Sequence, residues 1–133
     1  MAARTTPADD GVRRGRLAKA VQFAAAAETI LDLFDETAEV TDAYVTLCVH
    51  AGIAAADAIC ASRLGVHARG ENHRDAVALL AAADRGASHH LAVLLTMKTR
   101  AGYSHLPVSR ERAVRAGRAM DALLDTARRL TPR

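Results

Sequence analysis

The chain has 133 residues, the length of a single domain, and half of its residues are hydrophobic, which is enough for a core. Alanine, the best helix former, supplies 31 residues, whereas aromatic residues make up only 3% and Trp is absent. A small β-sandwich or barrel normally needs more aromatic and β-branched residues, so the composition favours an all-α bundle. The net charge of +3 is too small to indicate a nucleic-acid partner by itself.

The sequence has no apolar stretch of the roughly 20 residues that a membrane span needs, and its polar start has no hydrophobic segment of a secretory signal. We therefore expect a cytoplasmic protein without a membrane partner. Cys48 and Cys60 fit that location as two thiols of one apolar helix, about 18 Å apart along its axis and too distant for a disulfide. There is no CxxC, HExxH or Gly-rich phosphate loop, so the sequence predicts neither a metal site nor a cofactor.

Residues 1–12, with a proline and two adjacent aspartates, are expected to form a disordered tail. Gly65 is a natural C-terminal cap for a helix, Pro107 separates two helices, and Ser109 is typical of an N-cap. The short connections predict one up-and-down antiparallel bundle domain over residues 13–131. Apolar residues recur at helical spacing in five segments, which predicts helices over residues 13–34, 38–64, 72–84, 88–102 and 109–130.

The second predicted helix has one wide apolar face with a small polar cluster beside it. Its many alanines allow a neighbouring helix to approach closely. Thr46, His50 and Asp57 fall on one flank of that face, within about 40° of each other around the helix axis. They line a crevice at the edge of the core, or else they lie at the water boundary, as such residues more often do. His50 and Asp57 are about 10 Å apart along the helix, too far for a mutual hydrogen bond.

A pattern K-x-x-A-x-Y, followed by V-S-x-x-x-A-x-x-A, spans the end of the fourth predicted helix and the start of the fifth. Its residues are Lys98, Ala101, Tyr103, Val108, Ser109, Ala113 and Ala116. Together with the long Ala-rich helix that ends at Gly65, this pattern resembles the HEPN superfamily, above all its small single-domain bacterial members, over most of the chain. The resemblance implies an up-and-down helical bundle that is often dimeric. Many HEPN domains are metal-independent ribonucleases, and others bind RNA or nucleotides, sometimes beside a minimal nucleotidyltransferase in a toxin–antitoxin pair.

The nuclease branch of that superfamily has an R-x(4–6)-H motif near the end of a late helix, and Arg100 and His105 match it in spelling and place. By the resemblance, His105 takes the proton of a ribose 2′-hydroxyl and Arg100 stabilises the charge that develops on the phosphate. Side chains five positions apart on a helix diverge by about 140°, so the two converge only if the helix frays at Gly102. Ala101 stands where the nuclease branch often has a polar residue. The alternative is a solvated Arg100 and a plain loop histidine.

Lys98 and Tyr103 complete the candidate ligand-binding set with His50 and Asp57. Lys98 lies in line with a stripe of leucines, so it either extends its ammonium to solvent or pairs with Asp57 across the second and fourth helices. Tyr103 packs its ring on the end of the bundle and offers its hydroxyl to a partner. Structural roles for both residues remain open.

Two functions remain open at this point. The first is a HEPN protein that binds RNA or a nucleotide, with or without ribonuclease activity, as one half of a toxin–antitoxin or nucleotidyltransferase-associated system. Its partner would then be a cognate antitoxin or a nucleotidyltransferase. The second is a non-enzymatic, dimeric helical module that binds another protein. A homodimer is expected in either case, because the Ala-rich second helix and the amphipathic last helix offer more apolar surface than a five-helix core needs.

Overall fold

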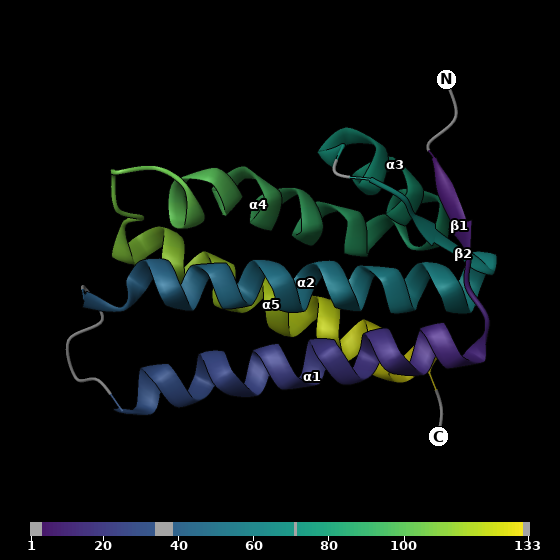
Figure 1. Ribbon diagram of the computed structural model, residues 1–133, viewed down its shortest axis with the longest axis horizontal. Helices are drawn as coiled ribbons and strands as arrows, with labels where there is room; N and C mark the ends of the chain where they lie inside the picture. Colours follow the sequence, from purple (N-terminus) through teal and green to yellow (C-terminus); the bar gives the residue numbers. More distant parts are fainter. Residues whose placement is uncertain (1–3, 34–38, 71, 132–133) are drawn as a thin grey trace.

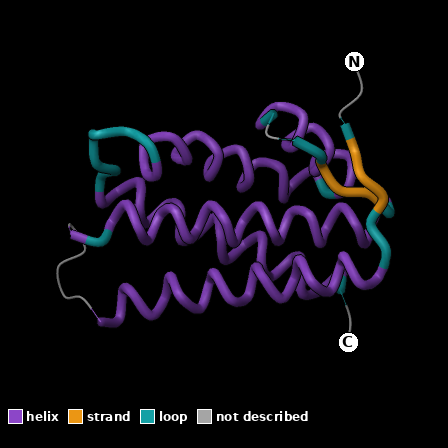
Figure 2. The backbone as a smooth tube through the Cα atoms, viewed as in Figure 1, coloured by secondary structure: helices purple, strands orange, loops and turns teal. Residues whose placement is uncertain are grey.

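The computed structural model describes residues 4–33, 39–70 and 72–131. These residues form five α-helices and one small two-stranded sheet, which confirms the predicted all-α class (Figure 1). The four long helices run in alternating directions, and the sheet and the short third helix sit at one end of the bundle (Figure 2). In chain order the elements are β1 (Thr5–Pro7), α1 (Asp10–Leu33), α2 (Thr41–Leu64), β2 (Val66–Ala68), α3 (His73–Ala83), α4 (Arg85–Gly102) and α5 (Arg110–Leu130).

The central element is α2, which lies between α1 and α4 while α5 runs diagonally behind it (Figure 1). Fourteen of its 24 residues are buried, so the wide Ala-rich face packs inside one chain. The expectation that this helix offers surplus apolar surface to a second copy is therefore wrong. Among the described helices, α2 is also the one long and apolar enough to cross a membrane, but two thirds of its apolar window is buried, as in a core helix.

Small residues let the helices around α2 approach closely at two positions. A Cβ at Gly52 would collide with the buried side chain of Leu94 and lie 3.2 Å from Leu123, so α4 and α5 both press against this point of α2. A Cβ at Gly117 of α5 would collide with the Tyr44 hydroxyl of α2. The side of α2 that meets α5 and the inner face of α4 is consequently tightly packed.

Local chemistry explains most helix ends. Gly65 ends α2 in a left-handed conformation, with φ of 69°, and donates its N–H to the carbonyl of Ala61. Ser109 accepts a hydrogen bond from the N–H of Arg112, which confirms its predicted role as N-cap of α5. The start of α4 was expected near Ser88 but lies at Arg85, because Asp84 caps the helix three residues earlier by accepting from Ala87.

The start of the chain corrects the prediction of a disordered tail over residues 1–12. Residues 5–7 form β1, which pairs antiparallel with β2, and the N–H of Ala8 donates to the carbonyl of Gly65. Helix α1 begins at Asp10, with Asp9 accepting from the N–H of Val12. The polar composition suggested disorder, but pairing with a strand some 60 residues away satisfies the backbone groups. Residues 1–3 lie outside the described part of the chain, as does residue 38, where α2 was expected to begin.

Candidate functional site

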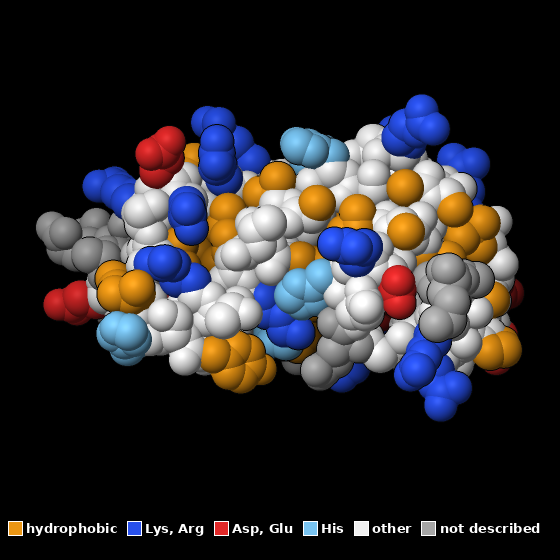
Figure 3. All heavy atoms as spheres, turned by 90° about the horizontal axis from the view of Figure 1, so that it is seen from above, with side chains coloured by type: hydrophobic (Ala, Val, Ile, Leu, Met, Phe, Trp, Pro, Cys, Tyr) orange, Lys and Arg blue, Asp and Glu red, His pale blue; other side chains and the backbone are white. Residues whose placement is uncertain are grey.

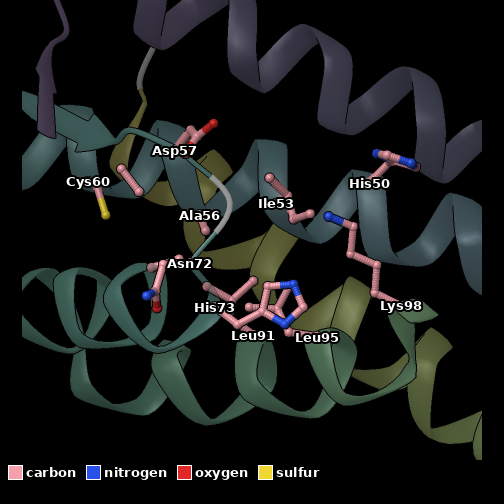
Figure 4. A pocket seen from close by; sticks show the side chains of 13 residues that line it. His50, Ile53, Ala56, Asp57, Cys60, Asn72, His73, Leu91, Leu95 and Lys98 are labelled. Atoms are coloured by element: carbon pink, nitrogen blue, oxygen red, sulfur yellow. The ribbon is translucent and has the colours of Figure 1, made fainter. Parts of the chain in front are cut away.

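A groove opens on the side of α2 that faces α3 and the outer edge of α4. Its larger part is a cavity of about 260 Å³, lined by His50 and Asp57 of α2, Lys98 of α4, and Asn72 and His73 at the start of α3. Apolar side chains form its floor, among them Ile53, Leu91 and Leu95 (Figure 4). Three of the four predicted ligand-binding residues therefore line one cavity.

A smaller cavity of about 150 Å³ continues the groove toward the α4–α5 connection. It shares His50 and Lys98 with the larger cavity and adds Thr46, Gly102 and Tyr103. Of the two alternatives that the sequence left open for Thr46, His50 and Asp57, a crevice at the edge of the core is thus present. Tyr103 lines its smaller part but is 79% exposed, so the expectation that its ring packs on the end of the bundle is wrong. The structure brings the four candidate ligand-binding residues to one groove, whereas their role in binding stays a prediction.

Asp57 is already engaged by other parts of the chain. The Arg16 Nε of α1 donates to its Oδ2 at 2.9 Å, and the His67 Nδ1 of β2 lies 4.0 Å from its Oδ1. Burial raises the pKa of the Asp57 carboxyl, and the charges of Arg16 and His67 oppose that shift. The carboxylate points toward α1 and away from Lys98 (Figure 4), so the ion pair with Lys98 considered from the sequence is not formed.

Among the described residues, Lys98 is a cation of the groove without an acidic partner. Its side chain is half-buried and extends from α4 toward Ile53 of α2 (Figure 4). Within the ranges that the structure describes, no carboxylate lies within 4.0 Å of its ammonium. His50 is exposed, and its ring lies 5.7 Å from that of Phe23 of α1, measured between centroids. A half-buried ammonium over an apolar floor attracts an anionic group attached to an apolar one.

Arg100 and His105 do not belong to this groove. Helix α4 continues through Gly102, where the N–H of Tyr103 still donates to the carbonyl of Thr99 at 2.8 Å, so the helix does not fray before that point. His105 follows in an exposed turn, and Arg100 stays on the helix. In the described residues neither side chain makes a hydrogen bond or an ion pair with another group. Their catalytic pairing stays a prediction, without a preformed site to support it.

The groove contains no reactive thiol. Cys60 lines the larger cavity and Cys48 lies deeper in α2, and burial raises the pKa of each thiol to about 12. Both are therefore protonated near neutral pH and are poor nucleophiles and poor metal ligands. Among the described residues, no three His, Cys, Asp or Glu side chains gather closely enough to hold a metal ion.

Sequence reasoning missed the contributions of Arg16, His67, Asn72 and His73 to the groove and its edge. Asn72 was recognised only as a helix start, where its Oδ1 accepts from the N–H of Asp75. Arg16 gives no signal in the sequence, because its partner is 41 residues away. The direction in which α3 folds over α2 decides the contributions of Asn72 and His73, whereas the positions of α1 and β2 beside α2 decide those of Arg16 and His67.

Comparison with known proteins adds no family assignment. Neither a scan against models of protein families nor a search of curated proteins finds a match to this chain. The HEPN resemblance therefore rests on the pattern of residues in the sequence alone and stays a prediction.

Proposed function

We propose that the protein binds a nucleotide-class anion in the groove between α2, α3 and α4, as a HEPN-like domain without a metal or cofactor. The observation that supports this most is the position of Lys98, a half-buried cation at a cavity with no carboxylate partner in the described part of the chain. Asp57, the acidic group at the same cavity, is neutralised by Arg16. Among the described residues, an anion entering the groove therefore meets one positive charge without an acidic partner and one acid that is already paired.

The shape of the groove suits a phosphate joined to a flat or apolar group. Lys98 and His50 lie where the two cavities meet, so a phosphate held there is within reach of both side chains. The base or sugar would then rest on Ile53, Leu91 and Leu95. With about 260 Å³, the larger cavity is at the lower end of the roughly 300–1,000 Å³ of typical ligand pockets, which favours a mononucleotide over a bulky dinucleotide.

Calorimetric titration with AMP, ATP, inorganic phosphate and a short RNA tests the proposal. The chain has only two lysines, and Lys19 is exposed on α1 and lines neither cavity of the groove, so Lys98→Ala and Lys19→Ala form a matched pair. We expect Lys98→Ala to weaken mononucleotide binding by at least about tenfold, equivalent to about 1.4 kcal/mol, and Lys19→Ala to leave it unchanged. Equal effects of the two variants, or no binding of any nucleotide by the parent, would contradict it.

The same protein preparation can be used to distinguish nucleotide binding in the groove from the ribonuclease hypothesis. If RNA is cut in the presence of EDTA to 2′,3′-cyclic phosphate ends, and His105→Ala abolishes the cutting, the groove is not the main functional site. His105 is exposed, so His105→Ala should leave the melting temperature unchanged. A loss of cutting by this variant would then not reflect unfolding. If neither binding nor cutting is seen, the protein-interaction module takes the place of both.

The cellular setting is part of the same proposal. Cys48 and Cys60 are free and buried, as is usual in a reducing compartment, which supports a cytoplasmic location. The HEPN resemblance supports a cognate antitoxin or nucleotidyltransferase as a partner. Co-purification of the tagged chain with the product of a neighbouring gene of either kind tests that part separately.

A further inference from the structure

The connection between α2 and α3 forms one wall of the larger cavity of the groove. Ala68 of β2 and Gly70 line the cavity there. Gly65 before β2 and Gly70 after it both have left-handed backbone conformations, with φ of 69° and 90°. Glycine has more backbone freedom than any other residue. This wall is therefore a short strand between two flexible points of the chain, and its position depends on contacts with other segments.

The start of the chain provides the backbone contacts of this wall. In the described part of the chain, the backbone hydrogen bonds that link residues 66–69 to another segment go to residues 4–7. The outermost of these bonds runs from the N–H of Arg69 to the carbonyl of Arg4, at 2.9 Å. The two strands lie side by side at the end of the bundle next to α3 (Figure 2). The wall is thus held by a segment that itself lines neither cavity of the groove.

Thr6 and His67 form the central bonded pair of this small sheet. Opposite residues of two antiparallel strands alternate between bonded and non-bonded positions, and Arg4 with Arg69 is a bonded pair two residues away. Pro7, which has no N–H, falls on a non-bonded position and costs the sheet nothing. The N–H of Thr6 is therefore the donor of β1 that the pairing needs.

This pairing is too small to be stable by itself. Each strand has three residues, two of those in β1 are exposed, and none of the residues of β1 belongs to the hydrophobic core of the described chain. An isolated two-stranded pairing is marginally stable at best, and such peripheral elements open without global unfolding. The His67 ring adds a loose contact to α2, with its Nδ1 4.0 Å from Oδ1 of Asp57. The start of the chain can thus leave β2 and return while the five helices stay folded.

We propose that residues 4–8 are a strap that regulates the groove by holding its wall in place. When the strap is docked on β2, Ala68 and Gly70 are fixed in the position that completes the cavity. When it is released, the wall loosens and the ligand binds more weakly. Because such coupling is reciprocal, a ligand in the groove must in turn favour the docked strap. This regulation rests on the proposed function of the groove.

The strap acts through the wall and not by blocking the entrance. The strands lie at one end of the bundle, whereas the groove runs along α2, α3 and α4 (Figure 1). On the face formed by α3 and α4, Lys and Arg side chains are spread along the molecule, and acidic side chains are few among those drawn in colour (Figure 3). An anion can therefore approach the groove over this face while the strap is docked.

Proline substitution at two adjacent positions of the strap tests the first half of the proposal. Thr6→Pro removes the N–H of a bonded pair, whereas Thr5→Pro removes an N–H at a non-bonded position, so the two variants are matched. Hydrogen exchange of the full chain, measured by NMR, reports on single amides. We expect the amides of His67 and Arg69 to exchange at least about fivefold faster in Thr6→Pro than in the parent, and Thr5→Pro to resemble the parent. The helical circular dichroism should be the same in all three proteins.

Titration with AMP tests the second half. Saturating AMP should slow the exchange of the His67 and Arg69 amides in the parent, a measurement that needs no variant. Calorimetry should show that Thr6→Pro binds AMP at least about fivefold more weakly than the parent and that Thr5→Pro binds it equally well.

The outcomes separate the strap from the function of the groove. If the parent binds AMP but its exchange at His67 and Arg69 does not change, or if Thr6→Pro binds AMP as tightly as the parent or more tightly, the strap proposal alone is overturned. Unchanged exchange of these amides in Thr6→Pro also overturns it, because the wall is then held without β1. If the parent binds neither AMP nor ATP, the proposed function fails, and the regulation of the groove fails with it.

Discussion

The two sides of α2 are built from the same Ala-rich helix, yet one is closed and the other is open. On the closed side Gly52 receives Leu94, and Tyr44 covers Gly117, so α4 and α5 lie against the α2 backbone. On the open side His50, Ile53 and Asp57 project from α2 and hold the neighbouring elements apart, which leaves the groove. Side-chain size at a few positions of one helix thus decides where the bundle is solid and where it can receive a ligand.

This difference also separates two kinds of residue in α2. Glycine and alanine on the closed side affect stability through packing, since any added atom has no room. Polar residues on the open side affect charge at the groove and add little to the core. Substitutions on the closed side should therefore change the free energy of unfolding more than those on the open side, which should mainly change the charge at the groove.

The largest expected difference is between two adjacent leucines of α4. Leu94 is fully buried on the closed side, whereas Leu95 lines the groove. Leu94→Ala should lower the free energy of unfolding by about 2–5 kcal/mol, because the surrounding side chains cannot fill the cavity that it leaves. Leu95→Ala widens a cavity that already exists, so its cost should be smaller by at least about 1 kcal/mol. Urea unfolding of both variants measures the difference, and equal costs would mean that the groove is packed as tightly as the core.

A smaller effect is expected where α5 meets α2. Gly117→Ala should cost about 1–3 kcal/mol, because its methyl group collides with the Tyr44 hydroxyl. Adding Tyr44→Phe removes that oxygen and leaves the nearest ring carbon at 3.4 Å, an ordinary contact, so the double variant should regain most of the loss.

The control for this pair is Gly15→Ala in α1, where nothing lies within 4 Å of an added Cβ. It should raise stability by up to about 1 kcal/mol through helix propensity alone. Failure of Tyr44→Phe to rescue Gly117→Ala would show that the backbone, and not the hydroxyl, sets the approach of α5.

Features that depend on local chemistry were readable from the sequence, and those that depend on distant partners were not. The caps at Gly65 and Ser109 follow from the residue itself and its near neighbours, and each was found where expected. The pairing of β1 with β2 and the hydrogen bond from Arg16 to Asp57 join residues 41 or more positions apart. The periodicity of the sequence gives no indication of either contact. Helix geometry correctly places Thr46, His50 and Asp57 on one flank of the second helix. It does not predict which other helix or strand faces that flank.

The smallest expected effect concerns Asp57, the ionisable group between the core and the groove. Burial raises the pKa of its carboxyl in the folded chain, and Arg16 and His67 only partly oppose this, so the folded chain binds that proton more tightly than the unfolded chain does. Its contribution to stability is therefore complete below the ordinary pKa of 3.8 and is lost as pH rises through the higher folded value. Asp57→Asn does not titrate, so the stability of the parent relative to this variant should fall as pH rises across that window.

Urea unfolding at a series of pH values from below 3.8 upward measures this fall in stability. The control is Asp32→Asn, which replaces an exposed carboxyl of α1. A parent that instead gains on the variant with rising pH would mean that Arg16 and His67 outweigh burial and keep the carboxyl ionised in the folded chain.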